Sequence, residues 1–221
     1  QSMTGEEAFN WLGSEYTSNA SVEGLENIPK DGKFLIVSNH PMGAADAIAL
    51  YHQIYPVRND LFFFANELFV YLLGAFHELL APVVWNKEKE THSANKVTLE
   101  RLSVFFGDGR PGIIFPSGRL SKLTFLGLWD RPWEKTPIAL AKKYNFPLIP
   151  VYVEGRNSWF FYFASYVNKQ LRDISQLNEL FNKREKEMSI KIGKPVNVYT
   201  LNDNTDICLL YTSPSPRDTA L

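Results

Sequence analysis

The order of apolar and helix-forming segments constrains the fold of this chain more than any other feature. Short apolar runs, each suited to a buried strand, alternate with longer segments whose composition and periodicity favour helices. The expected strands are 34–37, 61–65, 83–85, 113–115, 148–153 and 190–192. The expected helices are 5–14, 44–55, 68–80, 91–106, 137–144 and 169–188. This alternation predicts an α/β fold in which helices flank a largely parallel central sheet.

The length and charge of the chain limit the number of domains and the kinds of partner that we expect. The chain has 221 residues, which corresponds to one large domain or at most two. It contains no internal repeat and no linker-like segment, so we expect a single domain. The formal net charge of −1 provides no general basic field, and no nucleic-acid partner is expected. The one cysteine, Cys208, excludes a disulfide framework and favours a reducing, cytosolic compartment.

The two ends of the chain and its longest apolar region differ from the rest of the sequence. The domain is expected to occupy 1–208, with a natural start that lies upstream of residue 1. Residues 209–221 resemble translated adapter sequence, and we expect a non-native or disordered tail there. The apolar region 61–85 is interrupted by Asn66, Glu67 and other polar residues. We therefore expect it to be buried or interfacial and not to span a membrane.

The first cluster of residues that could take part in a reaction follows the strand expected at 34–37. Ser38-Asn39-His40-Pro41 ends that strand, because Pro41 has no N–H to donate to a sheet. Five residues then separate His40 from Asp46, and three of them are glycine or alanine, so the loop can fold tightly. A carboxylate on one ring nitrogen would leave the other nitrogen basic. The alternative is that His40 is an ordinary strand-end residue and Asp46 a helix N-cap.

The second cluster follows the strand expected at 113–115. Its sequence is Phe115-Pro116-Ser117-Gly118-Arg119-Leu120-Ser121. Gly118 allows close approach of the backbone, and the planar guanidinium of Arg119 suits a phosphate or a carboxylate. The alternative is an ordinary turn with a solvated arginine.

The third cluster follows the strand expected at 148–153. Gly155, Arg156 and Asn157 come after that strand, and an aromatic run at 159–163 comes next. This run could line an acyl groove, lie at a membrane surface or simply pack in the core. Ligands of open α/β sheets bind beyond the carboxyl ends of the strands, where all three clusters are expected.

Several other reaction types lack their sequence signatures. The chain has no G-x-S-x-G motif, no P-loop and no G-x-G-x-x-G after the first expected strand. Its four histidines are scattered and do not form H-E-x-x-H, so no metal site is expected.

Together the clusters resemble the glycerolipid (lysophospholipid) acyltransferase family, over about residues 25–195. His40 and Asp46 are similar to the histidine–aspartate motif of that family, and 115–121 resembles its F-P-E-G-T-R-S block. The sequence around Ile149-Pro150-Val151 is similar to its later proline block. The family usually has four residues between the histidine and the aspartate, and a glutamate at the position of Ser117. These departures resemble the bacterial hemolysin-like or ornithine-lipid-type branch.

The resemblance implies transfer of a fatty acyl group from acyl-CoA or acyl-carrier protein to a hydroxyl of a lysophospholipid or lyso-ornithine-type lipid. His40 would be the general base and Asp46 would orient it, with no cofactor or metal. The residues expected to contact the substrates are Asn39, Ser117, Gly118, Arg119, Gly155, Arg156 and Asn157. A peripheral position at the cytoplasmic face of the inner membrane is expected. The alternatives are a lipid esterase or thioesterase that uses water, and an inactive lipid-binding domain.

Overall fold

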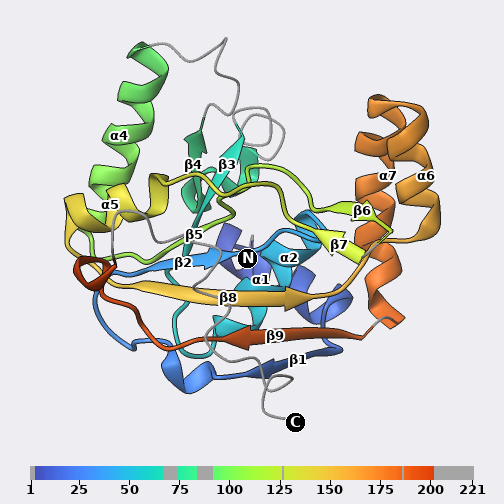
Figure 1. Ribbon diagram of the computed structural model, residues 1–221. Coiled ribbons are helices and arrows are strands. Elements are labelled where there is room, and N and C mark those ends of the chain that lie inside the picture. Colours follow the sequence, from blue (N-terminus) through green and yellow to red (C-terminus); the bar gives the residue numbers. More distant parts are fainter. Residues whose placement is uncertain (1–2, 67–73, 84–91, 126, 186, 202–221) are drawn as a thin grey trace, which may run out of the picture.

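The computed structural model describes residues 3–66, 74–83, 92–125, 127–185 and 187–201. Within these residues, seven strands form one sheet in the order β1-β9-β8-β2-β5-β3-β4 (Figure 1). The strands are β1 (Ala20–Glu23), β2 (Leu35–Ser38), β3 (Phe62–Asn66), β4 (Leu80–Val83), β5 (Gly112–Ile114), β8 (Leu148–Glu154) and β9 (Met188–Ile192).

The central part of this sheet is parallel. β8, β2, β5, β3 and β4 all run in the same direction, and Ile36 of β2 lies between Ile113 of β5 and Ile149 of β8. β9 runs antiparallel to β8, and β1 pairs in parallel with β9. The predicted single α/β fold with a largely parallel sheet is therefore confirmed.

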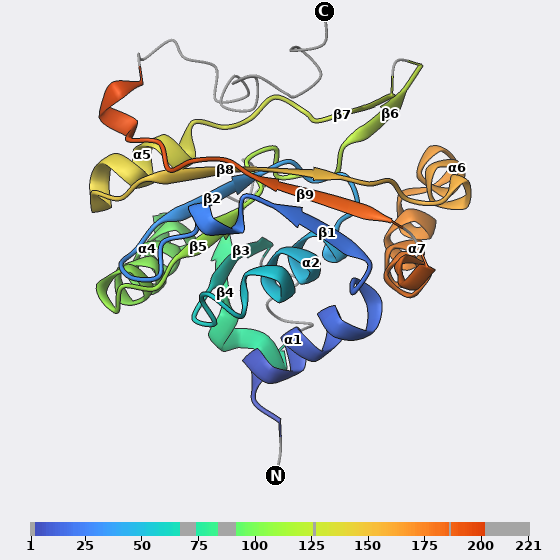
Figure 2. The same cartoon turned by 90° about the horizontal axis from the view of Figure 1, so that it is seen from below.

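Helices cover both faces of the sheet, which explains why its central strands are apolar throughout. Along β2, Ile36 packs in a core cluster with α1 (Gly5–Tyr16) and α2 (Ala44–Ile54). Leu35 and Val37 pack in a second cluster with α4 (His92–Gly107) and α5 (Thr136–Tyr144). Figure 2 shows α1 and α2 together on one side of the sheet.

Three expected elements differ from the structure. Of the helix expected at 68–80, the described part is the 3₁₀-helix η2 (Gly74–Leu79), and the chain enters β4 at Leu80. The strand expected at 83–85 is thus centred too late, and its last two residues lie outside the described residues. The helix expected at 169–188 ends early: α7 (Lys169–Phe181) is followed by η4 (Asn182–Glu185) and then by β9.

Other elements were not expected from the sequence. They are β1, the antiparallel hairpin of β6 (Lys122–Thr124) and β7 (Gly127–Trp129), two short 3₁₀ turns (Leu25–Asn27 and Val198–Thr200), and helix α6 (Trp159–Val167). In the part of the chain that the structure describes, no helix is both long and apolar enough to cross a bilayer. The tail expected at 209–221 lies outside the described residues.

Candidate active site

Three neighbouring strands bring the three sequence clusters together. β8, β2 and β5 lie side by side and run parallel, so their carboxyl ends share one edge of the sheet. His40 follows β2, Phe115 follows β5, and Gly155 follows β8. The loops after these strands therefore meet at that edge, as expected for a site in an open α/β sheet.

His40 and Asp46 are in contact. Nδ1 of His40 lies 3.0 Å from Oδ2 of Asp46, whose side chain is fully buried. The distance is that of an ion pair, but the Nδ1–H direction is not well aligned with the oxygen. Among the residues that the structure describes, Oδ1 of Asp46 has no hydrogen-bond partner. Catalytic hydrogen bonds are often loosely aligned before substrate binds. The imidazole is 19% exposed, and because Nδ1 is buried, Nε2 is the nitrogen available to a substrate.

Asp46 also caps helix α2. Its Oδ2 accepts hydrogen bonds from the backbone N–H groups of Met42, at 2.9 Å, and Gly43, at 3.0 Å. Gly43 has φ +81°, a conformation that side chains rarely adopt, and a Cβ there would lie 3.2 Å from Leu120. The N-cap of α2 is thus Gly43 and not Asp46, which lies at the third helical position and reaches back to the start of the helix while the same carboxylate meets the imidazole. The cap fixes the carboxylate where the imidazole meets it.

The second cluster packs against the imidazole. The ring of Phe115 stacks on that of His40, with centroids 4.0 Å apart and planes inclined by 22°. The backbone N–H of Ser121 donates to the carbonyl of His40 at 2.9 Å. The hydroxyl of Ser117 donates to the carbonyl of Arg119 at 2.8 Å, and Arg119 is exposed. The segment 115–121 thus encloses the histidine on one side.

Asp130 joins these segments and was not anticipated from the sequence. Its Oδ1 accepts a long hydrogen bond, 3.4 Å, from the backbone N–H of His40, and a second from the hydroxyl of Ser121. Its Oδ2 accepts from the indole N–H of Trp133 at 2.9 Å. Asp130 lies 90 residues from His40 in a region without a strong pattern, so no local signal could reveal it.

The third cluster contacts the loop between β2 and α2, which carries His40 and is called the histidine loop below, from the other side. The amide of Asn39 donates to the carbonyl of Val153 at 2.8 Å and accepts from its N–H at 2.7 Å. One hydrogen of this amide is left over, so its contact with substrate stays a prediction. Gly155 lies against Met42, because a Cβ at Gly155 would come within 2.5 Å of the Met42 sulfur. The loop after β8 is therefore fitted closely to the loop after β2.

A buried ion pair supports the loop after β8. The ammonium of Lys183 donates to the carbonyl of Arg156 and the side-chain oxygen of Asn157, each at 2.8 Å, and pairs with Glu179 at 3.4 Å. Glu179 also accepts from the N–H and hydroxyl of Ser158. Asn157, expected to contact substrate, is only 3% exposed and bonds inside the protein. Its side chain therefore holds the loop, whereas Arg156 is exposed.

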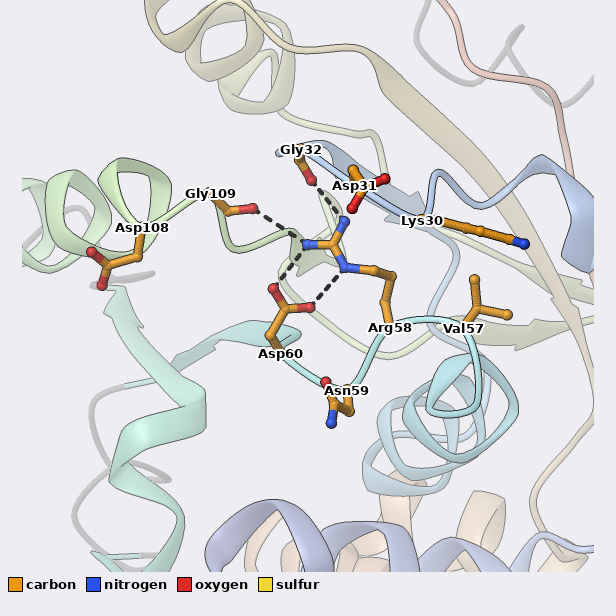
Figure 3. Close-up of a pocket in the computed structure, with 9 residues that line it drawn as sticks. All are labelled: Lys30, Asp31, Gly32, Val57, Arg58, Asn59, Asp60, Asp108 and Gly109. Carbon is orange, nitrogen blue, oxygen red and sulfur yellow. Dashed lines mark hydrogen bonds and ion pairs between the residues drawn. The ribbon is translucent and has the colours of Figure 1, made fainter.

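A separate hollow lies at the opposite edge of the sheet (Figure 3). It has a volume of about 430 Å³, and its walls come from the loops that precede β2, β3 and β5. At its centre, Arg58 makes a two-pronged contact with Asp60 and donates to three backbone carbonyls. These bonds use all five N–H groups of the guanidinium, so Arg58 ties the loops together and is not available to an anion.

Comparisons with known proteins identify the family of this chain. A family model described as "Acyltransferase" matches residues 7–208. Lyso-glycine lipid O-acyltransferases from Phocaeicola vulgatus and Bacteroides thetaiotaomicron are each 31% identical over 186 residues, or 81% of this chain. The chain spans 64% and 66% of the lengths of these two relatives.

A solved structure shows the same fold. The crystal structure of the 1-acyl-sn-glycerophosphate acyltransferase PlsC from Thermotoga maritima superposes with a TM-score of 0.52 at 22% identity. The match covers 91% of this chain and 69% of the other. The family match over most of the chain decides the assignment, and the chain belongs to the acyltransferase family.

Proposed function

We propose that this chain transfers a fatty acyl group from an acyl thioester to a hydroxyl of a lyso-lipid. The observation that carries the proposal is the contact between His40 and the buried Asp46 at the carboxyl edge of the sheet. The curated relatives, named as lyso-glycine lipid O-acyltransferases, support an acceptor of this class. Membership of the acyltransferase family supports the reaction type.

The mechanism follows from the two ring nitrogens of His40. Nδ1–H faces Asp46, so Nε2 takes the proton of the acceptor hydroxyl as its oxygen attacks the thioester carbonyl carbon. The new C–O ester bond forms, the C–S bond breaks, and the imidazolium returns the proton to the leaving thiolate. Asp46 stabilises the imidazolium while it exists. Phe115, stacked on the ring, restricts its rotation.

The substrates are assigned by chemical class. Arg119 and Arg156 are exposed on the loops beside His40, and each offers a guanidinium to a phosphate or carboxylate. The backbone at Gly118 allows close approach of the bound group. At Gly155 the space that a side chain would take is filled by Met42, so this glycine fits the loop to Met42. The donor is acyl-CoA or acyl-carrier protein, each of which carries a phosphate-bearing arm. Because the acceptor is a lipid, we place the protein peripherally at the cytoplasmic face of the inner membrane.

Replacement of the base tests the proposal. His40→Ala should lower acyl transfer by on the order of 10²–10⁴-fold, the usual contribution of a positioned general base. The measurement is mass spectrometry of lipids after incubation with labelled acyl-CoA or acyl-carrier protein and lyso-lipids. His77→Ala, at an exposed histidine of η2, is the matched control. Full activity of His40→Ala contradicts the mechanism, and free fatty acid without acylated lipid from the wild type indicates hydrolysis.

A further inference from the structure

Helix α6 presents an apolar face to the outside of the molecule. Its exposed large side chains occur at positions i, i+1, i+4, i+7 and i+8, which lie on one side of a helix. Their exposed fractions range from 57% to 92%. They are Trp159, Phe160, Phe163, Tyr166 and Val167. Soluble proteins rarely expose so large a continuous apolar surface without a partner.

The opposite side of α6 is firmly attached to the protein. Phe161 and Ala164 are buried against the protein, and Ser158 caps the helix by accepting from the N–H of Phe161. The hydroxyl of Ser158 in turn donates to Glu179 of α7. The exposed face therefore belongs to a fixed helix, and its side chains point outward as a set.

The segment that carries this face lies between Glu154 and Asp173, and its own charges favour an anionic partner. Residues 155–172 contain no aspartate or glutamate, although the whole chain has a net charge of −1. They contain three basic residues, namely Arg156, Lys169 and Arg172. Aromatic side chains next to basic ones are typical of surfaces that insert among lipid headgroups.

The β6–β7 hairpin provides a second apolar projection. Both views show this hairpin on the same side of the molecule as α6 (Figures 1 and 2). Phe125, just after β6, is fully exposed, and Lys122 at the start of β6 is exposed as well. The hairpin is linked to the histidine loop through Asp130. The two projections thus belong to the segments that flank His40.

We infer that the outer face of α6, together with Phe125, docks on the surface of an anionic lipid bilayer. The choice of lipid as the partner rests on the proposed function. Docking through this face sets the carboxyl edge of the sheet, with His40, against the headgroup layer. A lyso-lipid hydroxyl then reaches the base without leaving the membrane surface.

Flotation with vesicles tests the inference. The wild-type chain should float with vesicles of equal parts phosphatidylglycerol and phosphatidylcholine, and less well when salt is raised. Trp159→Ser/Phe163→Ser should weaken this partition roughly tenfold or more, because two aromatic contacts with lipid are lost. Trp11→Ser, at an exposed tryptophan of α1, is the matched control and should float like the wild type.

Three outcomes overturn the inference. They are a wild type that does not float, a double variant that floats as well as the wild type, and an effect of the Trp11 control equal to that of the double variant. Light scattering tests the alternative that a second copy of the chain binds to the outer face of α6. A wild-type dimer that becomes monomeric in the double variant, with unchanged flotation, assigns the face to self-association.

Activity on a short-chain, water-soluble lyso-lipid separates this inference from the proposed function. The double variant should transfer acyl groups to that acceptor at the wild-type rate and lose activity only on acceptor held in vesicles. If the wild type acylates neither acceptor but floats through α6, the proposed function fails and the docking surface stands.

Discussion

Asp46 serves helix α2 and the imidazole with the same oxygen. Oδ2 accepts from two backbone N–H groups at the start of α2 and also faces Nδ1 of His40. An asparagine at this position can keep the cap through its one oxygen. That oxygen would still face Nδ1, but the neutral amide has no charge with which to stabilise the imidazolium. The change would therefore alter the chemistry more than the helix.

Asp46→Asn should lower turnover by on the order of 10²-fold or more, with little change in the Michaelis constant of the donor. Steady-state kinetics with varied thioester concentration provide the measurement, and circular dichroism confirms that the variant is folded. A wild-type turnover number in this variant would remove the orienting role of Asp46.

Asp130 provides a second test at the level of single residues. Its carboxylate accepts from the N–H of His40, the hydroxyl of Ser121 and the indole of Trp133. Asp130→Ala leaves these donors without their acceptor, and should lower the free energy of unfolding by roughly 1–3 kcal/mol and reduce turnover of the folded enzyme. Urea denaturation and kinetics on the same samples measure both effects. Asp130→Asn, which keeps one acceptor oxygen, should recover part of each; equal turnover in all three proteins would show that the histidine loop does not need this contact.

The histidine–aspartate pair could be predicted because both residues lie in one short loop. The spacing of His40 and Asp46, and the small residues between them, were visible in the sequence. Asp130 and Val153 reach the same loop from 90 and 114 residues away. Pairings at such separations depend on strand order, and no single sequence pattern reports strand order.

At the scale of elements, prediction succeeded where burial leaves a strong pattern. The expected strand at 34–37 is β2 (Leu35–Ser38), because a strand covered on both faces is apolar along its length. The hairpin of β6 and β7 was missed because each strand has only three residues and none of them is fully buried. The helix expected at 169–188 was too long because 182–187 is rich in charged, helix-forming residues, whereas the structure has η4 at 182–185 and begins β9 at Met188.

The link between the loop after β8 and α7 predicts a dependence on pH. Burial raises the pKa of Glu179, but hydrogen bonds from Ser158 and the charge of Lys183 outweigh burial, so the pKa is lower than the ordinary 4.5. Because the pKa is lower in the folded state, the ionised carboxylate stabilises the fold above pH 4.5, and this contribution is lost as the pH falls through the folded-state value.

Glu179→Gln should therefore lower the free energy of unfolding at neutral pH by roughly 3–5 kcal/mol, because Lys183 stays buried without its ionic partner. The free energy of unfolding should also fall less steeply below pH 4.5 than in the wild type. Chemical denaturation at a series of pH values measures both effects, with the exposed Glu187→Gln as control. Parallel curves for Glu179→Gln and the wild type would contradict the assignment.

In the molecule as a whole, the carboxyl and amino edges of the sheet carry different kinds of residue. The carboxyl edge carries His40 and the exposed arginines, whereas the amino edge is closed by Arg58 and its saturated contacts. Stability and chemistry should accordingly respond to different substitutions.

Arg58→Met should lower the free energy of unfolding by roughly 3 kcal/mol, because several carbonyls and Asp60 lose a buried cationic partner. Turnover per folded molecule should stay at the wild-type value, since His40 lies at the other edge. Arg58→Lys should recover only part of the stability, because an ammonium cannot reproduce the planar fork. The measurements are denaturation curves and kinetics well below the melting temperature; a selective loss of turnover would connect the two edges.

The bonds between Asn39 and Val153 have a consequence for the order of folding. They join positions 114 residues apart, so the segment with the base is shaped by a strand that is synthesised much later. Contacts of such high sequence separation form late, because the intervening chain must first be organised. A nascent chain that already displays His40 would thus still lack the contacts that shape the loop around it. In the reaction that we propose, an acyl thioester would therefore meet a competent His40 only after β8 has joined the sheet.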